Sequence, residues 1–416
     1  MKQLKIIGGE KLTGSINISG AKNSAVALVP AALLSDEEVI IDNIPNISDI
    51  ESLKEIMKYL GAEITIKEQQ MKIKTDNMSN RKISLELSQK LRASYYFMGA
   101  LLGKYKKVEM YFPGGCSIGK RPINLHLKGF KALGAKVKEV DNYYCIEATE
   151  LKGNHIYLDI ASVGATINII LAAVKAQGKT IIENAAKEPE IVNVVTFLNN
   201  MGAKITGAGT GKIEIIGVSK LKSAYTEVIP DRIEAGTYTI LGALIGDNLK
   251  INNIIPEHIE SLIMKLKEMN ANIEVNQDNV IITQSDISSV NIKTVCYPGF
   301  PTDLQQPMTT LLTQAKGISK LEENIYENRF LNVKYLNDMG ADISINGKVL
   351  KIKGPTKLHG TTVFATDLRA GACLILAALI ADGTTTIKDV EHVLRGYGDI
   401  VEKLSSVGAK ISLEEI

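Results

Sequence analysis

Tryptophan is absent from this sequence, and only 5% of its residues are aromatic. Proteins that bind single-stranded nucleic acid stack the bases on aromatic side chains, so this composition offers no such platform. The excess of positive charge is also small, because the formal net charge is +2. Such a charge creates no overall field that would draw in nucleic acid or an anionic membrane. We therefore expect no nucleic acid and no membrane among the partners of this protein.

Cysteine is scarce as well, with four residues that lie far apart and form no CxxC pair. This pattern argues against structural zinc and is typical of a reducing compartment. For Cys145 and Cys373, which sit in apolar patterns, we expect buried and inert thiols. The five histidines show no metal-ligand spacing, so we predict no metal site. No apolar run approaches the roughly 18 residues of a membrane span, and Met1–Glu10 has no apolar signal core, so we expect a soluble cytoplasmic protein.

One short phrase occurs six times along the chain. A hydrophobic residue, then Gly or Asn, then Ala, precedes an alternating strand-like run, and successive copies lie about 70 residues apart. Gly adopts the left-handed cap of a helix without steric cost, and Asn is the next best residue. Each copy therefore predicts the end of a helix followed by the start of a strand. The copies are Leu60-Gly61-Ala62, Leu133-Gly134-Ala135, Met201-Gly202-Ala203, Met269-Asn270-Ala271, Met339-Gly340-Ala341 and Val407-Gly408-Ala409.

Each copy closes a repeat with the same internal order, which the first repeat illustrates. Residues 15–19 alternate as a strand, residues 24–34 carry no charge, and residues 38–41 form a second strand. An amphipathic helix is predicted over 48–60, followed by a hairpin that ends at residue 74. The repeat is therefore βαβαββ.

A charge-free segment recurs in every repeat. A helix that carries no charge on any side must be buried on all sides, so strands must surround these helices. We therefore predict an α/β fold with helices inside and sheets outside. Six such repeats exceed one core, and two inside-out α/β barrel domains of three repeats each are the economical division. The charge-free segments are 24–34, 93–103, 165–174, 235–246, 304–315 and 370–380.

The chain ends suggest how the domains are divided. The sixth repeat has only one strand after its Gly phrase, and we expect the strands of residues 4–19 to complete it. One domain would then span 22–229, and the other 1–21 together with 230–416. The chain would cross twice between them, which suits hinge closure over a cleft.

The entry to each charge-free helix collects charged and small polar residues. A helix N-terminus presents unpaired N–H groups and a positive dipole end, which together favour an anion. Basic residues at such an end oppose the dipole, so bound anions would explain them. The acidic residues have a second interpretation as ordinary N-caps, and the basic ones as solvated helix ends. The entries read Lys22-Asn23, Arg92, Ser162-Val163-Gly164, Asp231-Arg232, Asp303 and Asp367-Leu368-Arg369.

A glycine-rich loop over residues 111–122 is the second functional signal. Three glycines surround Cys116, which predicts an exposed loop, and the cations Lys120 and Arg121 would favour the reactive thiolate. The alternative is a buried, inert thiol.

Ten motifs spread over essentially the whole chain are specific in combination. They are Gly20-Ala21-Lys22-Asn23-Ser24, Leu91-Arg92-Ala93-Ser94, Pro113–Gly119, Arg121-Pro122, Ser162–Thr166, Glu183-Asn184-Ala185-Ala186, Pro230–Glu234, Phe300-Pro301-Thr302-Asp303, Glu327-Asn328-Arg329 and Ala365–Ala370. Through them the chain resembles the UDP-N-acetylglucosamine 1-carboxyvinyltransferases, enolpyruvyl transferases of the EPSP synthase superfamily. The fold of that family is two inside-out α/β domains.

The resemblance implies a reaction and its two small-molecule partners. The enolpyruvyl group of phosphoenolpyruvate passes to the 3-hydroxyl of UDP-N-acetylglucosamine, and phosphate is released. The route is addition followed by elimination through a tetrahedral intermediate, and the reaction is the first committed step of peptidoglycan synthesis. The resemblance implies no cofactor, and the sequence does not indicate an oligomeric state.

The resemblance also implies roles for individual residues. Asp303 matches the general base, and Cys116 matches the general acid, which can also be alkylated by the epoxide fosfomycin or hold phosphoenolpyruvate covalently. The phosphate clamp and its neighbours match Lys22, Arg121, Arg395, Arg92, Asp367 and Arg369. The positions that hold the sugar, uridine and diphosphate match Asn23, Asp303, Arg121, Pro122, Ile123, Asn124, Leu125, Ser162, Val163, Gly164 and Ile325.

Two residues depart from the pattern of the family, and two alternative functions remain open. Asn124 stands where many relatives carry Asp, and Ile160 stands where some carry Lys. The first rival is the sister enzyme that acts on shikimate 3-phosphate, which would not need the Cys116 loop. The second is a non-catalytic paralogue that binds UDP-N-acetylglucosamine.

Overall fold

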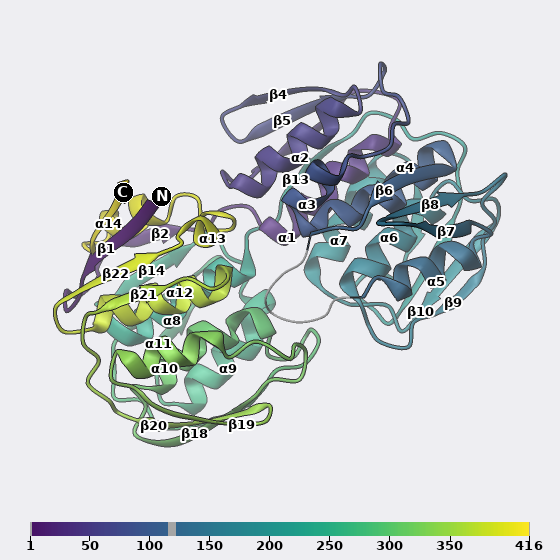
Figure 1. Ribbon diagram of the computed structural model, residues 1–416. Coiled ribbons are helices and arrows are strands. Elements are labelled where there is room, and N and C mark those ends of the chain that lie inside the picture. Colours follow the sequence, from purple (N-terminus) through teal and green to yellow (C-terminus); the bar gives the residue numbers. More distant parts are fainter. Residues whose placement is uncertain (1, 115–121, 416) are drawn as a thin grey trace. The chain divides into compact units, whose positions relative to one another are not determined.

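The computed structural model describes residues 2–114 and 122–415, which fold into two compact units (Figure 1). The amino-terminal unit consists of residues 20–114 and 122–229, and the carboxy-terminal unit of residues 2–19 and 230–415. Each unit has its own hydrophobic core.

Three buried helices form the centre of the amino-terminal unit: α1 (Lys22–Ala31), α4 (Tyr96–Tyr105) and α6 (Val163–Ala173). Apart from their ends these helices are fully buried, as their lack of charge predicts. The helices α2 (Ser48–Tyr59), α5 (Asn124–Ala132) and α7 (Pro189–Asn200) each bury one face and leave the other partly exposed. Shorter elements are η1 (Ala32–Leu34), α3 (Leu85–Lys90) and η2 (Arg92–Tyr95).

The sheets of the amino-terminal unit have the orders β13-β3-β5-β4, β6-β8-β7 and β11-β12-β10-β9. Their strands are β3 (Val39–Asp42), β4 (Glu63–Lys67), β5 (Gln70–Lys74), β6 (Lys107–Tyr111), β7 (Lys136–Val140), β8 (Tyr143–Glu147), β9 (His155–Tyr157), β10 (Lys179–Glu183), β11 (Lys204–Thr206), β12 (Lys212–Ile216) and β13 (Tyr225–Glu227).

The carboxy-terminal unit repeats this plan. Its buried helices are α8 (Arg232–Ile245), α10 (Gln305–Leu312) and α12 (Leu368–Ile380). The half-buried helices and short turns are η3 (Pro256–Ile259), α9 (Glu260–Glu268), η4 (Thr302–Leu304), α11 (Leu331–Asp338), α13 (Glu391–Leu394) and α14 (Ile400–Ser406). The predicted arrangement, with helices inside and sheets outside, is confirmed for both units.

The sheets of the carboxy-terminal unit have the orders β15-β16-β14-β2, β17-β18-β20-β19 and β21-β22-β1-β23. Their strands are β1 (Lys2–Ile7), β2 (Ser15–Asn17), β14 (Leu249–Asn252), β15 (Asn272–Val275), β16 (Asn279–Thr283), β17 (Asn291–Lys293), β18 (Gly317–Glu322), β19 (Asp342–Asn346), β20 (Val349–Gly354), β21 (Thr362–Phe364), β22 (Thr384–Lys388) and β23 (Lys410–Glu415).

One expectation about the chain start is only half correct. Strand β1 pairs with β22 and β23 and so completes the sixth repeat, as expected. Strand β2 instead pairs in parallel with β14 of the fourth repeat, while β13 pairs in parallel with β3 of the first. The chain passes from one unit to the other directly after β2 and again after β13. Strand β2 therefore occupies the parallel edge of the sheet of the fourth repeat, and β13 occupies the corresponding edge in the first repeat.

The six repeated phrases end helices as predicted. The central residue of each phrase has a positive φ, between 93° and 106° at the five glycines and 63° at Asn270. Five of the caps are Gly61, Gly134, Gly202, Gly340 and Gly408. The left-handed backbone is therefore the physical reason for the phrase.

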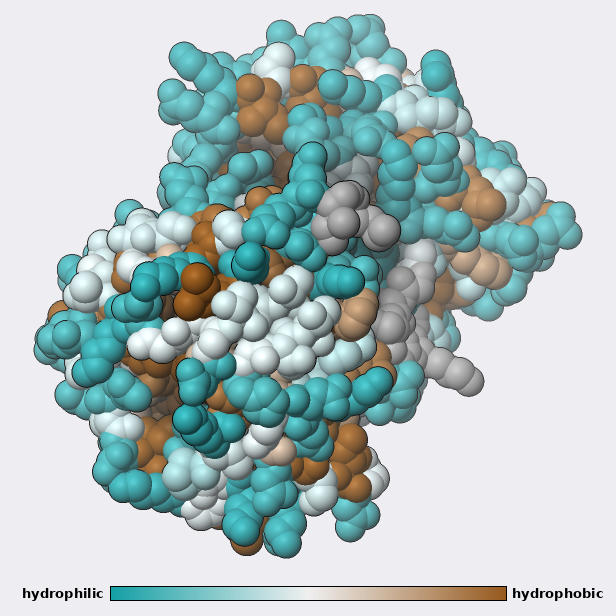
Figure 2. Space-filling view, turned by 60° about the vertical axis from the view of Figure 1, so that its left-hand side comes forward, coloured by the Kyte–Doolittle hydropathy of each residue, from teal (hydrophilic) through white to brown (hydrophobic). Residues whose placement is uncertain are grey.

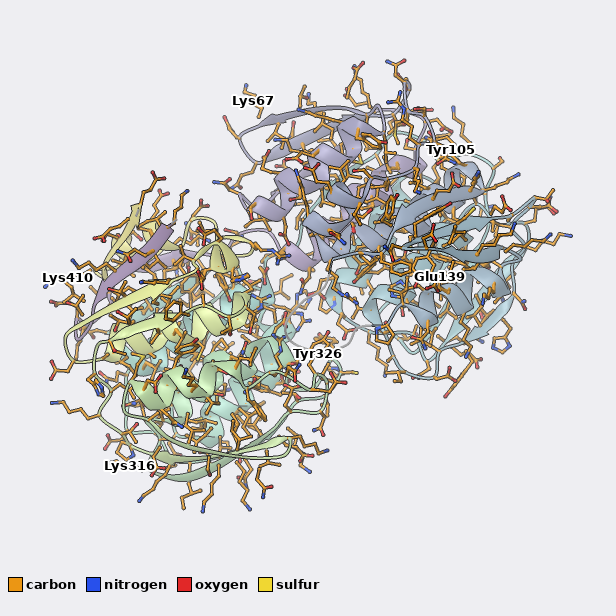
Figure 3. All side chains as sticks on the ribbon, in the orientation of Figure 1. Lys67, Tyr105, Glu139, Lys316, Tyr326 and Lys410 are labelled. Atoms are coloured by element: carbon orange, nitrogen blue, oxygen red, sulfur yellow. The ribbon has the colours of Figure 1, made fainter. Side chains whose placement is uncertain are left out.

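On the face shown in Figure 2, hydrophilic residues are interrupted by small hydrophobic areas. Charged side chains such as Lys67, Lys316 and Lys410 point away from the cores (Figure 3). Across residues 2–114 and 122–415, no helix combines the length and the apolar character that crossing a membrane requires.

Candidate active site

Three aspartates lie at the entries to the buried helices of the carboxy-terminal unit, and two of them are N-caps. The Asp231 carboxylate accepts hydrogen bonds from the backbone N–H groups of Ile233 and Glu234, at 2.8 and 3.1 Å. The Asp367 carboxylate accepts from Arg369 and Ala370, at 2.9 and 3.1 Å. The N-cap interpretation is therefore confirmed for Asp231 and Asp367.

Asp303 is different, because its carboxylate faces two arginines. It lies in the 3₁₀ turn η4, which has no side-chain cap. Its Oδ1 accepts from Nη2 of Arg329, and its Oδ2 accepts from Nη2 of Arg369 at 3.0 Å. The Asp303 side chain is 24% exposed, whereas those of Arg329 and Arg369 are 2% and 5% exposed. The carboxylate therefore forms the solvent-facing end of a buried basic pair.

Arg329 is held by groups from three elements. Its Nε donates to Oγ1 of Thr302 at 3.3 Å, and its Nη1 lies 3.8 Å from Oδ1 of Asp367. Its carbonyl accepts from Nε2 of Gln306 at 3.1 Å. The guanidinium carbon also lies 5.2 Å from the ring centre of Tyr326, which is labelled in Figure 3. Arg329 therefore links η4, α10 and the entry to α12.

The charge of Arg369 is stabilised by its surroundings. Burial lowers the pKa of this guanidinium, but the nearby Asp303, Tyr397 and Asp231 outweigh burial and raise the pKa above its ordinary value. Arg369 is therefore a permanent cation inside the unit. Two guanidinium groups and the carboxylates of Asp303 and Asp367 thus balance one another in a buried, charge-assisted network.

In the amino-terminal unit, Lys22 lies at the start of α1, as predicted. Its Nζ is 2.7 Å from Oδ2 of Asp49, which belongs to the first turn of α2. The two side chains are only 13% and 3% exposed. A positive group at a helix N-terminus opposes the helix dipole, and Asp49 compensates for this. Sequence reasoning missed Asp49, because its position in α2 is typical of an ordinary first-turn acid.

Ser162 and Gly164 define the start of α6. Oγ of Ser162 accepts from the backbone N–H of Ala165 at 3.3 Å, so Ser162 is an N-cap. A Cβ on Gly164 would lie 3.0 Å from the hydroxyl oxygen of Tyr95 and 3.0 Å from Cε1 of His126. Glycine at this position therefore allows close approach of two aromatic side chains to the helix start.

His126 is a buried neutral imidazole at this place. Burial, with the cation Arg92 nearby, lowers its pKa to about 3. Its Nδ1 lies 2.9 Å from Nδ2 of Asn168, whose Oδ1 accepts from the N–H of Gly99 at 2.8 Å. Nδ1 must then accept the hydrogen bond, so the proton of the neutral ring is on Nε2.

The remaining predicted residues lie as follows. Nη1 of Arg92 donates to the carbonyl of Gly114 at 3.4 Å. Arg395 is half-buried in the turn after α13, and Ile325 is exposed. The residues at the start of α5 and beside the helix entries vary in exposure: Asn23, Leu125 and Val163 are half-buried, Ile123 is buried, and Pro122 and Asn124 are exposed. Cys116, Lys120 and Arg121 lie outside the described residues.

The prediction of a buried thiol is confirmed for Cys373, whereas Cys145 is only partly buried. Burial raises the pKa of Cys373 to about 12, and burial also raises the pKa of Cys145. Both thiols are therefore protonated and unreactive at neutral pH. Within the described ranges, no group of three or more His, Cys, Asp or Glu side chains could hold a metal ion.

Comparison with known proteins identifies the family. The family described as EPSP synthase (3-phosphoshikimate 1-carboxyvinyltransferase) matches residues 6–404. The chain is 50% identical to "UDP-N-acetylglucosamine 1-carboxyvinyltransferase 2" of Bacillus subtilis, with 100% of this chain and 97% of that protein covered. It is 51% identical to the protein of the same name from Listeria monocytogenes, with 99% and 97% covered.

Solved structures agree with this assignment. The enolpyruvyl transferase NikO from Streptomyces tendae superposes with a TM-score of 0.90 at 27% identity, with 99% of this chain and 98% of that chain covered. An EPSP synthase from Acinetobacter baumannii superposes with a TM-score of 0.77 at 19% identity, with 100% of both chains covered, and so shares the fold. The predicted resemblance and fold class are confirmed: the chain belongs to the EPSP synthase family of carboxyvinyltransferases.

Proposed function

We propose that this protein transfers the enolpyruvyl group of phosphoenolpyruvate to the 3-hydroxyl of UDP-N-acetylglucosamine and releases phosphate. The acceptor is inferred from relatives that carry this activity in their names and align over the full chain at about half identity. The likeness to the EPSP synthase structure is much lower in sequence, at 19%. With this function we also propose a role in peptidoglycan synthesis and a place in the cytoplasm.

The observation that carries the proposal is the carboxylate of Asp303 between Arg329 and Arg369. The transfer needs a base for the sugar hydroxyl, and it needs cations for the carboxylate and phosphate of the donor. Asp303 is the exposed member of this cluster, so it can reach a bound sugar. Each of the two guanidinium groups already donates one hydrogen bond to a different oxygen of one carboxylate, so together they could hold a second carboxylate in the same way.

The ion pairs of Asp303 suggest how the donor and the base are coupled. A carboxylate held by two guanidinium groups is disfavoured as a base, because protonation would give up both ion pairs. The carboxylate of phosphoenolpyruvate has the same chemistry as the Asp303 carboxylate and would compete for Arg329 and Arg369. Donor binding would thereby release Asp303 to accept the proton of the sugar hydroxyl.

The other roles follow the motifs of the family. We assign Lys22, Arg121 and Arg395 to the phosphate of the donor, with Arg92 and Asp367 nearby, and Cys116 to protonation of the methylene carbon. Asn23 is assigned to the sugar. The uridine and diphosphate are assigned to residues 121–125, residues 162–164 and Ile325. The two functional domains are proposed to be residues 22–229 and residues 1–21 together with 230–416. Closure of these domains about a hinge remains a prediction.

Phosphate release tests the proposal. The purified protein is incubated with phosphoenolpyruvate and either UDP-N-acetylglucosamine or shikimate 3-phosphate. Released phosphate is measured, and the mass of the product is determined by mass spectrometry. Release with the nucleotide sugar alone, with a product heavier by one enolpyruvyl group, supports the proposal. Release with shikimate 3-phosphate alone would identify the sister enzyme, and release with neither acceptor would identify a non-catalytic binder.

A further inference from the structure

A buried tyrosine outside the predicted site lies against Arg369. The hydroxyl oxygen of Tyr397 accepts a hydrogen bond from Nη1 of Arg369 at 3.1 Å, while Nη2 of the same guanidinium donates to Asp303. The guanidinium carbon lies 5.6 Å from the centre of the Tyr397 ring. Tyr397 is 2% exposed. Arg369 is therefore held on one side by a phenol and on the other by the proposed base.

The hydroxyl of Tyr397 has one hydrogen-bond donor and one acceptor as its neighbours. Oγ1 of Thr237, in α8, donates its single proton to the carbonyl of Ile233 at 2.8 Å. Thr237 also lies 2.9 Å from the hydroxyl oxygen of Tyr397, and it can only accept there. Tyr397 must then donate to Thr237, which leaves its lone pairs for Arg369. The chain of donors runs from Arg369 through Tyr397 and Thr237 to the backbone of α8.

This chain is insulated from solvent. Burial raises the pKa of the Tyr397 phenol, although Arg369 and Thr237 oppose the shift. The Tyr397 hydroxyl is therefore neutral at physiological pH. It keeps its proton, which it donates to Thr237, and accepts the hydrogen bond from Arg369. An unpaired N–H on a buried guanidinium would be costly, so the position of the Tyr397 oxygen selects the orientation of Arg369.

The same tyrosine anchors the turn that carries Arg395. The backbone N–H of Tyr397 donates to the carbonyl of Val393 at 3.0 Å, and so does that of Gly396. Arg395 itself has helical backbone angles. The position of Tyr397 in the core therefore fixes the turn that carries Arg395.

We infer that Tyr397 is a positioning residue for the carboxyvinyl transfer, which sets the guanidinium of Arg369 to meet the carboxylate of phosphoenolpyruvate. This inference rests on the proposed function for the identity of the donor. It concerns the donor alone and is independent of which acceptor receives the enolpyruvyl group. Tyr397 touches no substrate in this proposal and acts through Arg369.

The test compares two buried tyrosines. Tyr397→Phe removes the oxygen that orients Arg369, and we expect the KM for phosphoenolpyruvate to rise about tenfold, the ratio that corresponds to one lost hydrogen bond of this kind. The KM for the acceptor should stay within about twofold. Tyr238→Phe is the matched control, because Tyr238 is buried in α8 and its hydroxyl has no hydrogen-bond partner among the described residues. This control should leave both KM values near those of the unchanged protein.

A second pair of variants tests the chain of donors. Thr237→Val removes the acceptor for the Tyr397 proton and should raise the KM for phosphoenolpyruvate, whereas Thr237→Ser keeps the hydroxyl and should restore it. The double variant with Tyr397→Phe should be no worse than the worse single variant, because both changes break one chain. This pair decides the matter if Tyr397→Phe does not fold.

The outcomes separate this inference from the proposed function. If only shikimate 3-phosphate supports turnover, the proposed acceptor is wrong, and the same comparison is made with that acceptor. If neither does, calorimetric titration with phosphoenolpyruvate measures its affinity in each variant. Equal effects of Tyr397→Phe and Tyr238→Phe, equal effects on donor and acceptor, or an affinity for phosphoenolpyruvate that Tyr397→Phe leaves unchanged would overturn the inference.

Discussion

The guanidinium of Arg369 donates a 3.0 Å hydrogen bond to Oδ2 of Asp303 and so joins the start of α12 to the turn before α10. These residues are 66 positions apart in the sequence. They hold equivalent positions in neighbouring repeats, and the pseudosymmetry of the unit brings both to the same end of the buried helices. The repeat thus explains why a carboxylate and a guanidinium meet here, although the two equivalent positions carry different side chains.

Replacing Asp303 tests its proposed role as the base. Asp303→Ala should lower turnover by about 10²–10⁴-fold, the usual contribution of a positioned acid or base, while the far-ultraviolet circular dichroism stays unchanged. Asp286→Ala is a suitable control, because this side chain is 86% exposed and pairs only with Lys316 in the described structure. Near-normal turnover of Asp303→Ala would remove Asp303 as the base.

Much of the fold was accessible from the sequence because local physics repeats six times. A Gly or Asn cap must end each helix, and a charge-free helix must be buried, so the repeat and the inside-out arrangement follow from short segments. The exchange of β2 and β13 was not accessible. Both strands obey the same local pattern as their equivalents, and only the path of the chain between the units decides which sheet receives them.

The sequence predicted which positions form the candidate site better than it predicted the role of each residue. Asp231, Asp303 and Asp367 occupy one register of the repeat, and each could have been an N-cap. What separates Asp303 is the presence of Arg329 and Arg369 at its oxygens, which no local pattern encodes. Tyr397 was missed for the same reason, because it lies outside the register and acts through a contact with a distant helix.

The buried neutral His126 predicts a pH dependence of stability. Its pKa is lowered to about 3 in the folded state from 6.5, so the unfolded chain binds the extra proton between these values. Stability is therefore complete above pH 6.5 and is lost as the pH falls toward 3. The free energy of unfolding should be about 1.4 kcal/mol lower at pH 5.5 than at pH 7.5.

Urea denaturation at the two pH values measures this loss. His126→Gln cannot gain a proton, so the difference between pH 7.5 and pH 5.5 should shrink in this variant. His155→Gln is a matched control, since His155 has an exposed side chain. A loss of stability that persists undiminished in His126→Gln would assign the pH dependence to other groups.

The helix caps give a prediction about backbone strain. Gly202 has φ of 101°, and a Cβ at this position would meet nothing within 4 Å. Gly202→Ala therefore introduces strain without a clash and should lower the free energy of unfolding by about 1–2 kcal/mol. Asn270→Gly, at φ of 63°, should be neutral or slightly stabilising. Chemical denaturation compares them, and a neutral Gly202→Ala would contradict the proposed reason for the repeated phrase.

The cysteines give a prediction about covalent inhibition by fosfomycin. Because burial raises the pKa of Cys373 to about 12 and also raises that of Cys145, neither thiol should open an epoxide at neutral pH. Mass spectrometry after fosfomycin treatment should place the adduct on Cys116. Cys116→Asp should keep turnover, since a carboxylic acid can also donate the proton, and should form no adduct. Cys296→Ser, at an exposed thiol, is the control and should be modified like the unchanged protein. An adduct that survives in Cys116→Asp would show that the reactive thiol has been assigned to the wrong residue.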